Sequence, residues 1–243
     1  MFIQEILGII AIIVLFIFLI LYKNYQKSGK SGEKNTLKII RKFLKNNHYQ
    51  SKDYYLVSNL ILQKEKYWSC EIDILLLTKK WIYIIEVKDW KRGRLSGNFN
   101  HEYLERSYQV GKQRKYQRHQ MYSPFYQNEQ HIKRFKSYFS LFNQPNILGI
   151  VVFNSPYLDI SLQTSKKSIF ENKHVFIRNS WDKNVSYWLA DYESKNTQLN
   201  FFQQLKEKLV KEITSSNKSQ KHRAWVKSVK EKKALKKREF KKI

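Results

Sequence analysis

The sequence predicts an α/β fold, in which a mixed central sheet is flanked by helices. The first observation is a pair of apolar runs, residues 72–77 and 81–87, which are separated by Lys79 and Lys80 and are typical of a β-hairpin. Both faces of these strands are apolar, so we expect the hairpin at the centre of a covered sheet. The second observation is another apolar run at 146–153, and the third is a set of apolar stripes with helical spacing.

The other elements follow from local patterns along the chain. An apolar stripe predicts a helix from about residue 32 to 46. Ser123 and Pro124 are residues that favour the start of a helix, which we expect to end near residue 142. The segment 91–122 is polar, basic and aromatic, and we expect a long surface excursion with little core of its own. The remaining expected elements are strands at 54–63 and 174–177 and helices at 180–192 and 198–213.

Alternation assigns the hairpin side chains to two faces. One face is expected to carry Asp73, Leu75, Leu77, Ile82, Ile84, Glu86 and Lys88. The other is expected to carry Ile72, Ile74, Leu76, Tyr83, Ile85 and Val87. The carboxylates on the first face therefore lie among large apolar side chains, where a charge is costly unless it is paired or bound to a metal.

The hairpin register brings two of these carboxylates together. If the two lysines form the turn, residues whose numbers sum to 159 lie opposite each other, so Asp73 faces Glu86 and Glu71 faces Lys88. Like charges directly opposite each other are destabilising, and this pair needs an explanation. A divalent cation held by both carboxylates is one explanation, since such cations bind carboxylate oxygens. A solvated sheet end with an ordinary Glu71–Lys88 ion pair is the other.

The composition gives the chain an extreme positive charge. Its 243 residues include 46 Lys and Arg against 20 Asp and Glu, for a formal net charge of +26. Such a charge favours a polyanionic partner, either nucleic acid or anionic lipid head groups. Cys70 is the single cysteine, which excludes a disulfide within one chain. The histidines are not placed with thiols at zinc-ligand spacing, so structural zinc is not expected.

The N-terminus carries an unbroken apolar run at residues 6–21. With its neighbours it reaches the length of about 17–25 residues that a membrane-spanning helix needs. A cleaved signal peptide is the competing interpretation, but Glu5 precedes the run and no small-residue cleavage site follows it. Lysines follow the run, and positive flanks stay on the cytoplasmic side. We therefore expect a single-pass anchor in the cell membrane, with the body of the protein in the cytoplasm.

The C-terminus forms a basic tail. From residue 218 onward, twelve Lys and Arg residues stand against Glu231 and Glu239. We expect a solvated electrostatic arm. The resulting division is an anchor and linker at 1–31, a main domain at 32–155, an extension of that domain at 156–216 and the tail at 217–243.

Several short motifs occur in a recognisable order. They are Gly32-Glu33 at a helix start, Glu71-Ile72-Asp73 on one strand, Ile85-Glu86-Val87-Lys88 on the next, and Pro124-x-x-Gln127-x-x-x-His131 at the start of a helix. Together they resemble the nuclease-related domain (NERD) family, a branch of the PD-(D/E)XK nuclease superfamily, over about residues 32–153. The resemblance implies a restriction-endonuclease-like core. Family members often carry transmembrane segments, in agreement with the expected anchor.

The resemblance also implies a role for each matching residue. Asp73, Glu86 and the backbone carbonyl of Val87 correspond to the metal ligands. Lys88 corresponds to the residue that positions the attacking water and stabilises developing phosphate charge. Glu33 corresponds to the acid of the first helix, and Gln127 to a helix residue that contacts the metal shell or the lysine. The oxygen ligands favour Mg²⁺, or Mn²⁺, over zinc.

These observations lead to two functional hypotheses. The first is a membrane-anchored, Mg²⁺-dependent endonuclease that acts on DNA in preference to RNA. The second is a catalytically silent tether that holds nucleic acid near the membrane. A weaker, third hypothesis is a scaffold that faces lipid. For the first two we expect basic side chains to contact the phosphates, and the candidates are Lys91, Arg92, Arg94, Lys112, Arg114, Lys115, Arg118 and Arg134.

Overall fold

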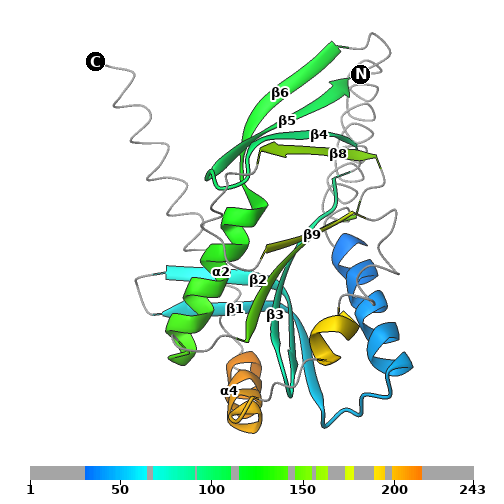
Figure 1. The fold of residues 1–243 in the computed structure, drawn as a ribbon. Coiled ribbons are helices and arrows are strands. Elements are labelled where there is room, and N and C mark those ends of the chain that lie inside the picture. The colour runs from blue at the N-terminus through cyan, green and yellow to red at the C-terminus, as the bar shows by residue number, and fades with distance from the viewer. Residues whose placement is uncertain are drawn as a thin grey trace, which may run out of the picture.

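The computed structural model describes residues 31–64, 68–90, 92–110, 115–141, 146–154, 157–163, 173–177, 189–194 and 199–214 (Figure 1). The expected anchor at 6–21 and the basic tail lie outside these residues. Across the part of the chain that is described, no helix has the length and apolar character needed to span a membrane.

A five-stranded mixed sheet forms the centre of the fold. Its strands are β1 (Tyr54–Lys64), β2 (Trp68–Thr78), β3 (Ile82–Lys88), β7 (Ile147–Phe153) and β9 (Lys173–Ile177), in the order β1-β2-β3-β7-β9. β1, β2 and β3 pair antiparallel, whereas β3, β7 and β9 run parallel. The predicted strands at 54–63, 146–153 and 174–177 are therefore confirmed, and the hairpin occupies the middle of the sheet.

Helices cover both faces of this sheet, which confirms the predicted α/β fold. On one face, a helix at residues 31–46 and a short helix at 189–194 pack against Ile74, Leu76, Tyr83 and Ile85. On the other face, α2 (Pro124–Phe139) and α4 (Phe202–Thr214) pack against Leu75, Leu77, Ile82 and Ile84. Figure 1 shows α2 in front of the sheet, α4 at the bottom of the view and the helix at 31–46 beside the sheet. The side chains of the hairpin thus follow the predicted faces.

The segment 91–122 differs from its prediction. Instead of a surface excursion, it forms β4 (Gly93–Asn98), β5 (Tyr103–Val110) and β6 (Lys115–Tyr122), which join β8 (Leu158–Gln163) in a second sheet of order β6-β5-β4-β8. Leu95, Leu104 and Leu158 are buried in it and pack with Phe125 and Phe153. The sequence did not indicate this because the segment buries only a few, widely spaced apolar residues among polar ones. Figure 1 shows the second sheet above the first.

A paired irregularity in β1 and β2 changes one of the predicted faces. Asn59 has a left-handed φ of 55°, and the register passes from Ser58–Ile74 to Leu60–Ile72 without a partner pair at Asn59 and Asp73. At this point the alternation of β2 side chains between the two faces of the sheet shifts by one residue. Ile72 therefore packs on the α2 side with Leu75, opposite to its predicted face. The shift places Asp73 at a break in the strand, where its side chain can turn toward the end of β3.

Candidate active site

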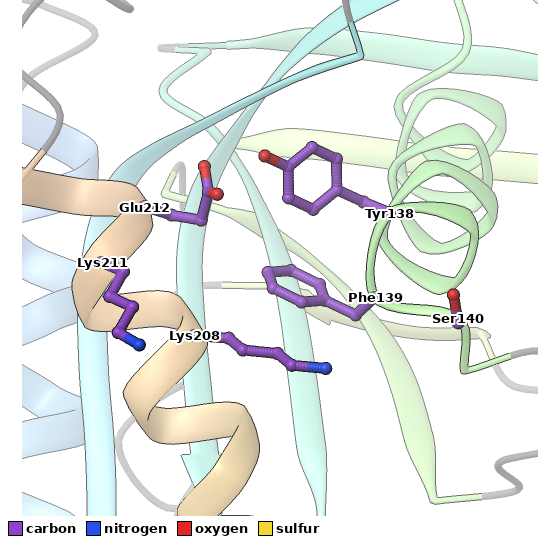
Figure 2. A pocket seen from close by; sticks show the side chains of 6 residues that line it. All are labelled: Tyr138, Phe139, Ser140, Lys208, Lys211 and Glu212. Atoms are coloured by element: carbon purple, nitrogen blue, oxygen red, sulfur yellow. The ribbon is translucent and has the colours of Figure 1, made fainter.

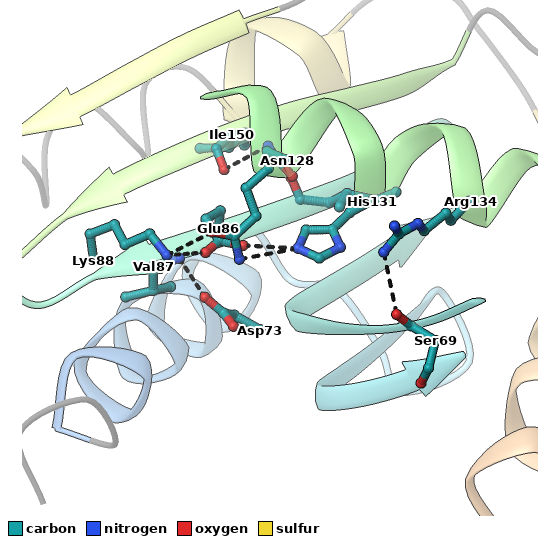
Figure 3. A network of polar contacts seen from close by, with 11 residues as sticks. Ser69, Asp73, Glu86, Val87, Lys88, Asn128, His131, Arg134 and Ile150 are labelled. Atoms are coloured by element: carbon teal, nitrogen blue, oxygen red, sulfur yellow. Dashed lines mark hydrogen bonds and ion pairs between the residues drawn. The ribbon is translucent and has the colours of Figure 1, made fainter. Parts of the chain in front are cut away.

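The candidate active site lies where the carboxyl ends of β3 and β7 meet the first turns of α2 (Figure 3). Glu86 and Lys88 lie two residues apart on β3, so both side chains point to the face that α2 covers. Gln127 lies on the first turn of α2 and accepts a hydrogen bond from Lys88 Nζ at 3.1 Å. The predicted grouping of these three residues is therefore observed.

Local interactions fix the start of α2 against the sheet. Ser123 caps the helix, because its side chain accepts a hydrogen bond from the backbone N–H of Tyr126 at 3.3 Å. One turn into the helix, Asn128 Nδ2 donates to the carbonyls of Ile84 and Ile150 at 3.2 and 3.1 Å. A Cβ atom at Gly149 would lie only 3.0 Å from Asn128 Nδ2, so the glycine permits this close approach. Sequence reasoning missed Asn128, although it directly follows Gln127.

Glu86 is the centre of a polar network that also contains Asp73, Lys88, Gln127 and His131. It is 1% exposed, and its Oε1 accepts from Lys88 Nζ at 2.5 Å. Its Oε2 lies 3.3 Å from His131 Nε2, in a geometry that leaves this buried oxygen without a hydrogen-bond partner. Figure 3 shows Lys88, Glu86 and His131 from two elements converging at this point. The carboxylate is thus held by two neighbours, and the longer contact of its Oε2 with His131 does not satisfy that oxygen.

The charges of Glu86 and Lys88 stabilise each other against burial. Burial acts to raise the pKa of Glu86, but the charge of Lys88 and the contact with His131 outweigh it and hold the pKa below its usual value. For Lys88 the signs are reversed: burial acts to lower the pKa, and the charge of Glu86 raises it above the usual value. Both groups are therefore ionised near neutral pH.

Asp73 is the second carboxylate, and its environment is different. Its Oδ2 accepts from the backbone N–H of Val87 at 2.8 Å. Burial raises the pKa of Asp73 to about 7, and the charges of Glu86 and Glu33 add to the rise. Without a cation, Asp73 is therefore poised to titrate near neutral pH. A bound divalent ion would favour the ionised form.

Two predicted cross-strand pairs do not form. Pairing between β2 and β3 ends at Ile74–Ile85, so neither Asp73–Glu86 nor Glu71–Lys88 is an opposed pair in the register. The physical reason is the break at Asp73, where its carboxylate accepts the N–H of Val87. Asp73 and Glu86 nevertheless remain close enough for the charge of one to raise the pKa of the other.

Glu33 is brought to the same place from the other side of the sheet. It lies on the helix at 31–46, near the first residues of the chain that the structure describes, and its charge contributes to the raised pKa of Asp73. Gly32 allows this helix to approach the strand ends, because a Cβ there would lie 2.7 Å from Asn154 Nδ2 and 2.9 Å from Asp89 Cβ. Glu33 thus lies close enough to Asp73 for its charge to act on that carboxylate, and its role in the site stays a prediction.

The oxygen donors present here fit a hard divalent cation. Asp73 and Glu86 are carboxylates, and Oε2 of Glu86 is a buried acceptor that lies 3.3 Å from His131 but has no hydrogen-bond partner. Mg²⁺ is commonly bound through one or two carboxylates while it keeps several waters. The described residues contain no group of three or more His, Cys, Asp or Glu side chains that could hold a metal. The side-chain donors would thus be the two carboxylates, with Val87 the predicted backbone ligand.

The predicted phosphate-binding residues are spread over several elements. Lys91, Lys112 and Arg114 lie outside the described residues, and Lys115 begins β6. Arg92 is exposed just before β4, and Arg118 is exposed on β6 of the second sheet. Arg94 lies on β4 with its Nε 3.5 Å from Asp159, and Arg134 donates to the carbonyl of Ser69 at 3.3 Å. Arg94 and Arg134 thus already have protein partners.

A surface pocket of about 360 Å³ lies away from this site (Figure 2). It is lined by Tyr138, Phe139 and Ser140 at the end of α2 and by Lys208, Lys211 and Glu212 of α4. At 1.5 Å per residue along a helix, Ser140 is roughly 20 Å from Gln127. The pocket is therefore separate from the carboxylates and takes no part in the candidate site.

Comparison with known proteins gives one match. The sequence profile described as "nuclease-related domain" matches residues 28–154, which is more than half of the chain. The matched range includes every residue of the polar network and both sheets except β8 and β9. No curated protein and no solved structure matches the chain.

Proposed function

Because the chain belongs to the nuclease-related domain family, whose general placement is the PD-(D/E)XK nuclease superfamily, we propose that it is a nuclease. It would hydrolyse phosphodiester bonds, of DNA in preference to RNA, with a divalent cation. The observation that carries this proposal is the convergence of Asp73, Glu86 and Lys88 at one end of β3. A buried carboxylate with an oxygen that lacks a hydrogen-bond partner, beside a partly buried lysine, suits the binding of a cation and a phosphate together.

The residues of the site have separate roles in this proposal. Asp73 and Glu86 would hold Mg²⁺ or Mn²⁺, which when bound polarises the phosphate and lowers the pKa of a coordinated water. The Lys88 ammonium would stabilise the negative charge that develops on the phosphate oxygens. Gln127 positions that ammonium through its Oε1, and His131 holds the Glu86 carboxylate in place. Glu33 would add negative charge to the site, as its effect on the pKa of Asp73 indicates.

A catalytically silent nucleic-acid tether is the second candidate. One observation favours it: the described residues offer two side-chain metal ligands close together, not three. In that case Lys88 and Glu86 would serve only as a buried ion pair, and the basic surface alone would bind nucleic acid. The two candidates therefore differ in metal-dependent cleavage and not in binding.

Cleavage is tested with the purified full-length chain on supercoiled plasmid, single-stranded DNA and RNA, in Mg²⁺, Mn²⁺ or EDTA. We expect metal-dependent cleavage of DNA. Glu86→Gln and Lys88→Ala should each lower the rate on the order of 10²–10³-fold or more, as the loss of one transition-state contact does. Glu129→Gln is the matched control, because it removes a carboxylate from the neighbouring helix α2, where Glu129 is 3.9 Å from Lys133. Wild-type protein that binds DNA and cuts nothing would support the tether instead.

We further propose that residues 6–21 anchor the chain in the cell membrane, with the nuclease domain in the cytoplasm. The support is the length of this apolar run and the lysines that follow it. Full-length protein should sediment with membranes and resist extraction with alkaline carbonate. A tag after Ile243 should be protected from protease in intact cells. Recovery of a shorter, soluble chain would contradict the anchor and point to signal cleavage.

A further inference from the structure

Arg106 lies on the face of the second sheet that looks toward the candidate site. In the register of this sheet, Leu95 pairs with Arg106, and Arg106 pairs with His119, so the three side chains share one face. Leu95 is buried on that face and packs in the cluster that contains Phe125 and Phe153. These two rings come from the start of α2 and the end of β7, the elements that border the site.

Two aromatic rings hold the guanidinium in place. Its carbon is 5.0 Å from the ring centroid of Trp90 and 5.2 Å from that of Tyr108, within the range of cation–π contacts. Trp90 follows Lys88 by two residues and packs on Phe153 at 5.4 Å between centroids. Arg106 Nη2 also donates to the backbone carbonyl of Arg92 at 3.2 Å. The position of the charge is thus fixed relative to the end of β3.

Among the described residues, no carboxylate pairs with the Arg106 guanidinium, although the side chain is partly buried. Burial lowers the pKa of the Arg106 guanidinium, and its buried Nε has no hydrogen-bond partner. None of the ion pairs among the described residues joins Arg106 to a carboxylate. By contrast, Arg94 on the opposite face of the same sheet is near Asp159 and donates to Ser161. A partly buried, rigidly held cation that has no carboxylate partner in the described part of the chain is suited to an external anion.

We propose that Arg106 is a phosphate-binding site that holds a backbone phosphate of the nucleic-acid strand next to the one that is cleaved. This inference rests on the proposed function, because it takes the occupant of the neighbouring site to be a phosphodiester. The planar guanidinium can donate two parallel hydrogen bonds to phosphate oxygens, and the rings on either side keep it oriented for them. Sequence reasoning did not single out Arg106, because only the sheet brings it near Trp90.

Binding is measured without cleavage, by fluorescence anisotropy of a short DNA oligonucleotide and the full-length chain in EDTA over a range of salt concentrations. When the logarithm of the binding constant is plotted against the logarithm of the salt concentration, each phosphate contact contributes a slope of about −0.7 to −0.9. We expect Arg106→Gln to weaken binding roughly tenfold and to reduce the slope by about one contact. Lys79→Gln is the matched control, since it removes the same charge at the far end of the hairpin, where Lys79 pairs with Asp53.

A second variant and a competition experiment test whether the Arg106 guanidinium contacts a phosphate of the nucleic acid. Arg106→Lys keeps the charge and loses the planar fork, so the slope should stay near wild type while affinity falls severalfold. Inorganic phosphate should compete no better than chloride at equal ionic strength, and specific competition would assign the site to free phosphate instead. Thermal unfolding of each variant confirms that it folds.

The result separates this inference from the proposed function. If Arg106→Gln binds DNA with the affinity and slope of Lys79→Gln, the phosphate site is wrong, whether or not the wild type cuts DNA. If the wild type never cuts DNA and Arg106→Gln still loses one contact, the nuclease proposal fails and the phosphate site stands. Wild-type protein that does not bind DNA at all would overturn both.

Discussion

Two buried carboxylates, Glu86 and Glu193, lie at opposite ends of the β2–β3 hairpin and are satisfied in opposite ways. Glu193 accepts hydrogen bonds from three neutral hydroxyls: Thr78 Oγ1 at 2.7 Å, Tyr83 OH at 2.8 Å and Tyr49 OH at 2.7 Å. Both of its oxygens are occupied. Glu86 instead meets a lysine and a histidine, and its Oε2 has no hydrogen-bond partner.

The difference separates a structural carboxylate from one that can take a ligand. Burial, followed by the neighbouring Glu193, raises the pKa of both Tyr49 and Tyr83, so both hydroxyls remain protonated donors at neutral pH. The network around Glu193 is therefore closed, and it fastens residues 189–194 to the sheet. The network around Glu86 and Asp73 contains unlike and like charges together. It also has an oxygen without a hydrogen-bond partner, which an added cation would satisfy.

The contrast between Glu86 and Glu193 predicts its largest effect on stability at Glu193. Glu193→Ala would remove the acceptor of the Tyr49 and Tyr83 hydroxyls, would leave Thr78 only its longer contact with the Trp81 carbonyl, and would open a cavity. We therefore expect a loss of about 3–5 kcal/mol in the free energy of unfolding. Urea denaturation of the full-length chain measures it. DNA binding below the unfolding transition should stay at the wild-type level, because the candidate site lies at the other end of the hairpin.

Glu193→Gln is the companion variant, since one amide oxygen can still accept from Thr78 and Tyr83. It should cost less than the alanine variant. The contrast between a structural Glu193 and a ligand-binding Glu86 would be wrong if either change at Glu193 lowered the metal-dependent cleavage rate while leaving the protein as stable as wild type. The carboxylate would then have a functional role that its closed network does not indicate.

The parts of the site that the sequence predicted are those set by local pattern. The β2–β3 register, which sums to 159 as expected, follows from a short turn between two apolar strands. Alternation then places Glu86 and Lys88 together on one face. The start of α2 follows from a serine and a proline that cap a helix in isolation as well as in a fold. These features depend on neighbours within a few residues.

The parts that the sequence did not predict depend on contacts between distant residues. Glu193 meets Tyr83 across 110 residues of chain, and no local pattern indicates this contact. The break at Asn59 and Asp73 requires two strands to depart from regularity together, so period-two counting assigned Ile72 to the wrong face. Arg106 acquires its environment only when β5 and the end of β3 are brought together by a sheet that few apolar residues mark.

A smaller effect, at Asp73, tests the open network in the absence of metal. Because the pKa of Asp73 is raised from 3.8 to about 7 in the folded protein, its contribution favours folding most below about pH 4 and is lost as the pH rises through about 7. Asp73→Asn removes this pH dependence and keeps an oxygen that can accept from the N–H of Val87. The pKa difference sets an upper limit of roughly 4 kcal/mol, and we expect about half, since the side chain is partly solvated.

In EDTA near pH 4, therefore, Asp73→Asn should unfold at about the same urea concentration as wild type. At pH 8 it should unfold at a higher concentration, and this gap between the two urea midpoints should widen steadily from pH 4 to pH 8. Adding Mg²⁺ at pH 8 should stabilise the wild type and reduce the gap, because a bound cation offsets the repulsion between Asp73 and Glu86. A gap that stays constant from pH 4 to pH 8 would mean that Asp73 titrates normally. Glu86 would then be the only carboxylate of this site whose ionisation the fold controls, and the contrast with Glu193 would rest on its unsatisfied Oε2 alone.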